Sequence, residues 1–169
     1  IIIFFFTFKI MRTAITKIFA FFSLLVLLGF IEDKNEFYSV LACDSITKID
    51  GYLLKLEKES SSSKNKAYTG ALLAKKASFE KGAATKIKTF KSGVQLLELE
   101  ITKYPNNIEY RFIRWSIQEH APKLLKYNKN IQEDLQLITS NFTKQHKSLQ
   151  TIIFNYAIKS ERLDTNLLK

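Results

Sequence analysis

The most chemically distinctive part of this 169-residue chain is YPNNIEYRFIRWSIQEHAP, from Tyr104 to Pro122. It holds the only tryptophan, two of the four arginines and one of the two histidines. On a helix that runs to about His120, four of its side chains project from one face: Arg111, Arg114, Trp115 and Gln118. Two guanidinium groups can grip a carboxylate or a phosphate, and arginine and tryptophan are frequent hot spots of protein interfaces. We therefore take this face as the candidate partner-binding surface.

The same face has a structural alternative. A helix in a stack of hairpins is buried on two sides, so the two arginines would then pair with acidic residues nearby. Three glutamates are the expected partners for that pairing: Glu98, Glu100 and Glu119. The pair Glu133-Asp134 is interpreted differently, as the first turn of a helix, where the helix dipole favours negative charge.

A less favoured hypothesis is an enzyme or small-ligand pocket near Arg114, Glu119 and His120. The helical spacing places His120 on the core side, at a helix C-terminus where the dipole favours a protonated imidazole. No nucleophile or second base lies within reach along the sequence. A histidine that bonds a helix-end carbonyl or a nearby carboxylate is therefore the favoured interpretation, and we predict no catalytic residue.

Cofactor and metal motifs are missing from the sequence. The glycines do not form a phosphate-binding loop, and Cys43, His120 and His146 are too widely spaced for a metal site. Cys43 is the only cysteine, so it has no partner for an internal disulfide. We predict neither a cofactor nor a bound metal.

The elements that must position these residues are helices. The chain is 46% hydrophobic but has only five glycines and two prolines, which favours an all-α core over a small β-fold. Apolar residues at three- and four-residue spacing predict helices over about 38–59, 67–79, 84–104, 108–120, 130–138 and 149–163. Asn107 and Asn130 are the expected N-caps, the latter in a capping box with Glu133. Residues 60–66, SSSSKNK, are the expected flexible linker.

These helices predict a fold of stacked antiparallel helix hairpins. Residues 65–74 and 107–116 share the pattern Asn-x-x-Tyr, and small residues on the helix over 67–79 favour close packing. The spacing of Ala74, Ala77, Phe90 and Gly93 resembles a lengthened, degenerate tetratricopeptide-like hairpin. That resemblance supports the hairpin architecture rather than membership of the tetratricopeptide family.

The N-terminal segment has the pattern of an export signal. We interpret Met11 as the start and residues 1–10 as upstream sequence. Arg12 and Lys17 precede an apolar run from Ile18 to Ile31, which is shorter than the roughly 20 residues that span a bilayer. We therefore expect residues 11–31 to be a signal peptide, followed by a single helical domain over 35–169. The alternative is an uncleaved membrane anchor formed by residues 18–31.

Cys43 follows Val40-Leu41-Ala42, a sequence that resembles the lipidation motif of bacterial lipoproteins. That chemistry needs the cysteine directly behind the apolar run, whereas EDKNEFYS lies between them, and Leu41 is bulky for its position. A buried cysteine within a helix is the favoured interpretation.

The formal net charge of +10 comes from 22 lysines and only four arginines. A basic protein can bind nucleic acid or an anionic membrane. Here the lysines are scattered among glutamates, so we favour a solvated basic surface and keep a peripheral membrane or nucleic-acid binder as an alternative.

Four segments carry a wider resemblance: residues 67–77, 106–114, 117–122 and 127–134. With the N-terminal signal, they resemble a group of small exported helical proteins of Bacteroidota-type Gram-negative bacteria. The resemblance implies an exported helical protein in the periplasm or envelope; it implies no particular activity and brings no catalytic residues. The predicted function is a non-catalytic scaffold module that binds another protein or an envelope component.

Overall fold

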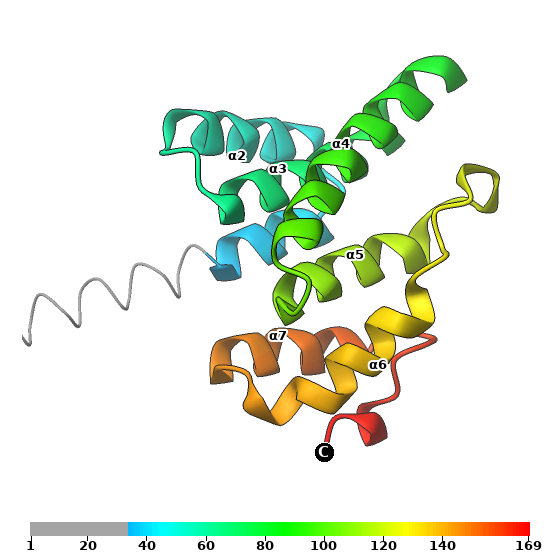
Figure 1. Cartoon of the computed structure of the whole chain (residues 1–169). Helices are drawn as coiled ribbons and strands as arrows, with labels where there is room; N and C mark the ends of the chain where they lie inside the picture. The colour runs from blue at the N-terminus through cyan, green and yellow to red at the C-terminus, as the bar shows by residue number, and fades with distance from the viewer. Residues whose placement is uncertain (1–33) are drawn as a thin grey trace, which may run out of the picture. The chain divides into compact units, whose positions relative to one another are not determined.

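The computed structural model describes residues 34–169, of which residues 37–169 form one compact unit (Figure 1). Residues 34–42 are helical. Six longer helices follow: α2 (Ile46–Lys58), α3 (Ser63–Lys76), α4 (Ala83–Lys103), α5 (Ile108–His120), α6 (Ile131–Asn141) and α7 (Lys147–Ala157). Short 3-10 turns lie at η1 (Ala77–Phe79), η2 (Lys123–Leu125), η3 (Phe142–Lys144) and η4 (Thr165–Leu167). Residues 34–169 contain no strand, so the prediction of an all-α fold is confirmed.

The predictions for residues 1–31, that is the start at Met11 and the signal peptide or anchor, lie outside the described residues. Within the described part of the chain, none of the helices has the length and apolar character needed to cross a membrane.

Local signals set most helix ends correctly. Gly82, at φ 83°, adopts a left-handed conformation that a side chain would oppose, and α4 starts directly after it. Pro105 follows the end of α4, as predicted. Asn107 caps α5, because its Oδ1 accepts a hydrogen bond from the Tyr110 backbone nitrogen at 3.2 Å. The turn after Pro122 is also present, as η2.

The predicted helix over 38–59 is wrong, because the chain breaks at residues 43–45. Ser45 starts a new helix there by accepting a hydrogen bond from the Lys48 backbone nitrogen at 3.4 Å. Cys43 lies in this break and is half-buried, so the prediction of a buried helical cysteine is also wrong.

The core begins upstream of Cys43. Phe37 is fully buried and stacks on Tyr68 with ring centroids 3.6 Å apart, and Val40 is buried beside it. Lipoprotein processing cleaves the chain directly before the modified cysteine, so processing at Cys43 would remove both residues from the core.

The predicted linker over 60–66 is ordered over most of its length. Ser62 accepts a hydrogen bond from the Asn65 backbone nitrogen at 3.0 Å, so α3 begins at Ser63. The Asn65 side chain is buried and donates to Glu59 Oε2 and to the Ser60 carbonyl, both at 3.0 Å. A run of serines that reads as a flexible linker thus holds an N-cap and a closed turn.

Two further predictions fail near the C-terminus. Asn130 is the N-cap residue of α6, as predicted, but its side chain makes no capping hydrogen bond; its Nδ2 instead donates to Glu133 Oε2 at 3.1 Å, so the capping box is absent. The helix predicted over 149–163 ends at Ala157 as α7. The chain then continues irregularly, although Leu163 and Leu168 remain buried in the core.

The hairpin of α3 and α4 is held by an unusually close helix crossing. A Cβ atom placed on Gly93 would lie 2.5 Å from the Ala74 backbone nitrogen and 2.6 Å from the Gly70 carbonyl oxygen. Only two glycines facing one another permit this approach. Small residues therefore do pack at this hairpin, as the sequence predicts, but a single close crossing does not define a tetratricopeptide repeat.

Helix α5 lies between α4 on one side and α6 and α7 on the other (Figure 1), and it contributes to two hydrophobic cores. Tyr110 and Ile113 contribute to the core formed with α2, α3 and α4, while Phe112 and Trp115 contribute to the core formed with α6 and α7. Nine of the thirteen residues of α5 are buried as a result. The helix that carries the candidate site is thus the most enclosed element of the unit.

Candidate functional site

The candidate face of α5 is buried rather than exposed. The exposed fractions are 8% for Arg111, 4% for Arg114, 0% for Trp115 and 3% for Gln118. A docking surface must be reachable by its partner, so the prediction that this face binds a partner is wrong for the folded unit. The structural alternative, in which the face packs against the next hairpin, describes it correctly.

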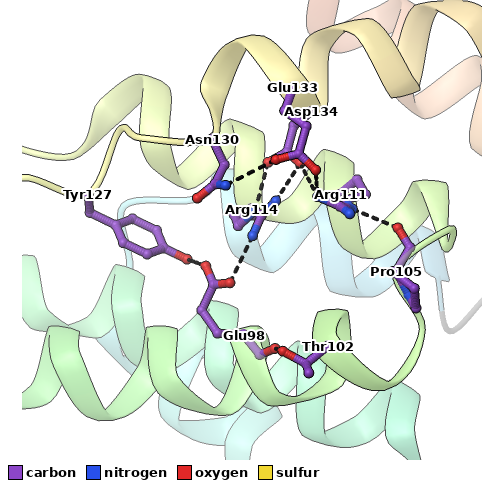
Figure 2. Close-up of polar contacts among 9 residues, drawn as sticks. All are labelled: Glu98, Thr102, Pro105, Arg111, Arg114, Tyr127, Asn130, Glu133 and Asp134. Atoms are coloured by element: carbon purple, nitrogen blue, oxygen red, sulfur yellow. Dashed lines mark hydrogen bonds and ion pairs between the residues drawn. The ribbon is translucent and has the colours of Figure 1, made fainter.

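Asp134 is the centre of the arrangement that buries the two arginines (Figure 2). Its carboxylate is fully buried and accepts two hydrogen bonds from Arg114, from Nε at 2.7 Å and from Nη2 at 2.6 Å. Arg111 Nη1 donates to the same carboxylate at 3.1 Å. The two parallel hydrogen bonds from Arg114 form a bidentate contact, which is the strongest geometry that an arginine can make with a carboxylate.

Two further carboxylates complete this group. Arg114 Nη1 donates to Glu98 Oε2 at 2.8 Å, and Arg111 Nη1 donates to Glu133 Oε1 at 2.9 Å. Arg111 Nε also donates to the Pro105 carbonyl at 2.8 Å. We call these five charged side chains the arginine cluster: Glu98, Arg111, Arg114, Glu133 and Asp134. It joins α4, α5 and α6 (Figure 2).

The carboxylates around Arg114 favour its charged form. Burial by itself would lower the pKa of the Arg114 guanidinium, but the hydrogen bonds and charge of Asp134, with help from Glu98, outweigh it and raise the pKa. The pKa of Glu133 is lowered, mainly by its hydrogen bond from Asn130. Partial burial would raise this pKa, and the nearby charge of Arg111 lowers it further. All three nitrogens of Arg114 are occupied by carboxylate oxygens, so this guanidinium is not available to a ligand.

Asp134 is the residue that the sequence interpretation missed. Its place in the first turn of a helix favours an acid through the helix dipole, but Asp134 also lies in line with Ile131 and Ile138, the other buried residues of α6. An acid at the core position of an apolar stripe requires a buried cation, and Arg111 and Arg114 are the buried arginines of the described chain. Of the three glutamates expected to pair with them, Glu98 does so, whereas Glu100 binds Lys103 and Glu119 binds α7.

Trp115 and Gln118 complete the buried face. The indole of Trp115 meets the ring edge of Tyr156, with centroids 5.8 Å apart, while the Arg111 guanidinium turns towards the carboxylates. Trp115 Nε1 and Gln118 Oε1 are buried and have no hydrogen-bond partner among the described residues. Trp115 belongs to the core formed with α6 and α7, and Gln118 is buried as well, so neither side chain is open to a partner.

Of the three residues of the alternative pocket, Glu119 and His120 come together at the Tyr156 hydroxyl, which lies 3.3 Å from His120 Nδ1, whereas Arg114 is turned away from them. Arg114 belongs to the arginine cluster, and Glu119 accepts hydrogen bonds from the hydroxyls of Tyr156 at 2.5 Å and Ser160 at 2.7 Å. Burial, with the Glu119 hydrogen bond, raises the pKa of Tyr156.

His120 is exposed, so its predicted place on the core side is wrong. Its Nδ1 lies 2.9 Å from the Ser116 carbonyl oxygen, which agrees with a histidine held by its own helix end. Among residues 34–169, no three His, Cys, Asp or Glu side chains gather closely enough to hold a metal ion.

A basic surface lies elsewhere, where two segments without acidic residues meet. Residues 81–97 contain four lysines and residues 120–132 contain three, and neither segment contains an aspartate or glutamate. The fold joins them, because the rings of Phe90 and Tyr127 meet edge to face with centroids 5.5 Å apart. We call the seven exposed lysines the lysine-rich end: Lys81, Lys86, Lys88, Lys91, Lys123, Lys126 and Lys129.

The lysine-rich end lacks counter-charges. None of its seven lysines forms an ion pair with another residue of the described chain, whereas Lys75, Lys76 and Lys103 elsewhere do. The acidic residues that border its two segments are Glu80, Glu98 and Glu133, and the last two are bound to arginines. The interpretation of scattered lysines missed this surface because its segments are far apart in the sequence and meet only in the fold.

Comparisons of the chain with protein-family models, with curated proteins and with solved structures gave no significant match.

Proposed function

We propose that the protein is an exported, non-catalytic helical module of the cell envelope that binds an acidic partner through its lysine-rich end. One observation carries the proposal: seven exposed lysines share one end of the unit without an ion-pair partner among the described residues. Uncompensated charge of one sign attracts an oppositely charged partner and speeds its association. The arginine cluster supports the proposal as well. Its carboxylates form ion pairs with Arg111 and Arg114, so they do not neutralise these lysines.

Charge reversal tests the binding surface. In a variant with Lys88→Glu, Lys91→Glu and Lys129→Glu, we expect retention on immobilised heparin to be largely lost. The salt dependence of binding should also weaken, with a log–log slope smaller by about one for each lysine that engages the polyanion. Elution from heparin over a sodium chloride gradient measures both effects, and circular dichroism checks that the helices are intact.

The matched control reverses the same amount of charge elsewhere. Lys144, Lys147 and Lys159 are exposed residues at or beside α7, and their replacement by glutamate should leave most of the retention in place. If both triple variants lose retention equally, only the net charge matters and the lysine-rich end is not the binding surface.

Export is tested separately, with alkaline phosphatase fused after Asn35. The basic residues Arg12 and Lys17 precede the apolar run that ends at Ile31, which is the pattern of an export signal. The fusion should therefore be exported and enzymatically active in a Gram-negative host. The same fusion without residues 18–31 should be inactive. An inactive full-length fusion, in a host that exports other such fusions, would refute the export proposal.

A further inference from the structure

The turn at η2 presents an apolar side chain in the middle of the lysine-rich end. Leu124 has an exposed fraction of 81%, the largest of the exposed large hydrophobic residues in the described chain. Lys123 precedes it and Lys126 follows two residues later, both exposed. An exposed leucine flanked by lysines combines the two interactions that hold a protein on an anionic bilayer: apolar burial and charge attraction.

The turn that carries Leu124 is held in place from both sides. Leu125 packs into the cluster formed by Ala74, Phe90 and Val94, and the Tyr127 hydroxyl donates to Glu98 at 2.6 Å. Backbone hydrogen bonds close the turn, including one from the Leu125 nitrogen to the Pro122 carbonyl at 2.9 Å. Leu124 therefore projects from an ordered turn, and its insertion would cost little additional conformational entropy.

From these observations we infer that the acidic partner is an anionic phospholipid bilayer, with Leu124 inserted between the lipids and the lysines on their headgroups. This inference rests on the proposed function and names its partner. Each lysine near such a surface contributes about fivefold to the binding constant, and burial of one leucine side chain contributes at least about tenfold.

The surface chemistry favours a bilayer over a nucleic acid. Single-stranded nucleic acids are bound through stacking on exposed aromatic and arginine side chains. At the lysine-rich end Phe90 is buried and the Tyr127 hydroxyl is occupied, while Arg111 and Arg114 lie inside the arginine cluster. An exposed leucine has no role on a phosphate backbone, whereas a bilayer interior receives it directly.

The test measures sedimentation of the protein with vesicles, using protein recovered from the periplasm of the expression host so that any N-terminal processing is complete. Vesicles of equimolar phosphatidylglycerol and phosphatidylcholine should bind it, and vesicles of phosphatidylcholine alone should not. Leu124→Ser should lower the partition onto the anionic vesicles about tenfold and leave heparin retention unchanged. The control Ile158→Ser replaces another exposed apolar residue, 63% exposed at the end of α7, and should change neither.

A second variant gives a direct signal of insertion. Leu124→Trp places an indole at the tip, and its emission should shift to the blue and be quenched by brominated lipid only on anionic vesicles. Trp115 is fully buried, so the native indole gives a constant background that can be subtracted.

The outcomes separate this inference from the proposed function. If Leu124→Ser binds the anionic vesicles as well as the unmodified protein does, Leu124 is not an anchor and the inference is overturned. Heparin retention without any vesicle binding also overturns it and identifies a polyanion, such as a nucleic acid or an acidic protein, as the partner. If the triple charge reversal leaves heparin retention unchanged, the proposed function itself fails.

Discussion

Gly93→Ala is expected to destabilise the protein by about 3 kcal/mol or more, one of the largest effects of any single methyl group added to this chain. The added Cβ would meet the backbone nitrogen of Ala74 at 2.5 Å and the carbonyl oxygen of Gly70 at 2.6 Å. Backbone atoms within a helix cannot move aside as a flexible side chain does. Helices α3 and α4 would have to separate, and the contacts that bury Tyr68 and Leu97 would loosen. Urea denaturation followed by circular dichroism measures the loss.

Gly51 provides the matched control for this prediction. It lies in the interior of α2, where an added Cβ would meet nothing within 4 Å. Gly51→Ala should stabilise the protein by about 0.5–1 kcal/mol, because alanine has the higher helix propensity. Equal stability of the two variants would mean that α3 and α4 do not approach as closely as described.

Asp134→Ala is the second large prediction, with an expected loss of about 3–5 kcal/mol. The substitution removes the one carboxylate that both Arg111 and Arg114 share, so two guanidinium groups lose a partner in a buried position. Such a loss is a large part of the roughly 5–15 kcal/mol that stabilise a typical domain. The urea midpoint and the thermal melting temperature should both fall, and the fall should be measurable at neutral pH.

Two comparisons show whether buried charge is the cause. Asp44→Ala removes an exposed carboxylate that binds Lys75 at 2.9 Å, and it should leave the melting temperature unchanged. Arg114→Met combined with Asp134→Leu replaces a buried ion pair by apolar side chains and should recover part of the lost stability. If the double variant is less stable than Asp134→Ala alone, volume rather than unpaired charge explains the loss.

The elements that could be predicted from the sequence are those with strong local signals. Gly82, Pro105 and Asn107 mark helix ends through their own backbone and side-chain chemistry, so α4 and α5 agree with the prediction within one residue. Serine is ambiguous, because the same residue favours linkers and N-caps. Ser45 and Ser62 act as caps here, which is why one predicted helix is two and the predicted linker is mostly helical.

The candidate site depended on contacts that local patterns do not contain. Helical periodicity placed Arg111 and Trp115 on one face correctly, but it cannot tell whether a second layer of helices covers that face. The covering helix α6 did carry a signal, since Asp134 occupies a core position between Ile131 and Ile138. The lysine-rich end carried no comparable signal, because its two segments come together only when Phe90 meets Tyr127.

The position of α5 between two cores determines how the chain unfolds. In an array of repeats, each unit touches only its neighbours and the ends can melt while the middle persists. Here Tyr110 and Phe112, two residues apart, anchor opposite halves. Unfolding of either half exposes one side of α5 to solvent. It also removes carboxylate partners from the arginine cluster. We therefore expect the stability of the two halves to be coupled through the thirteen residues of α5, so that the protein melts as one cooperative unit rather than hairpin by hairpin.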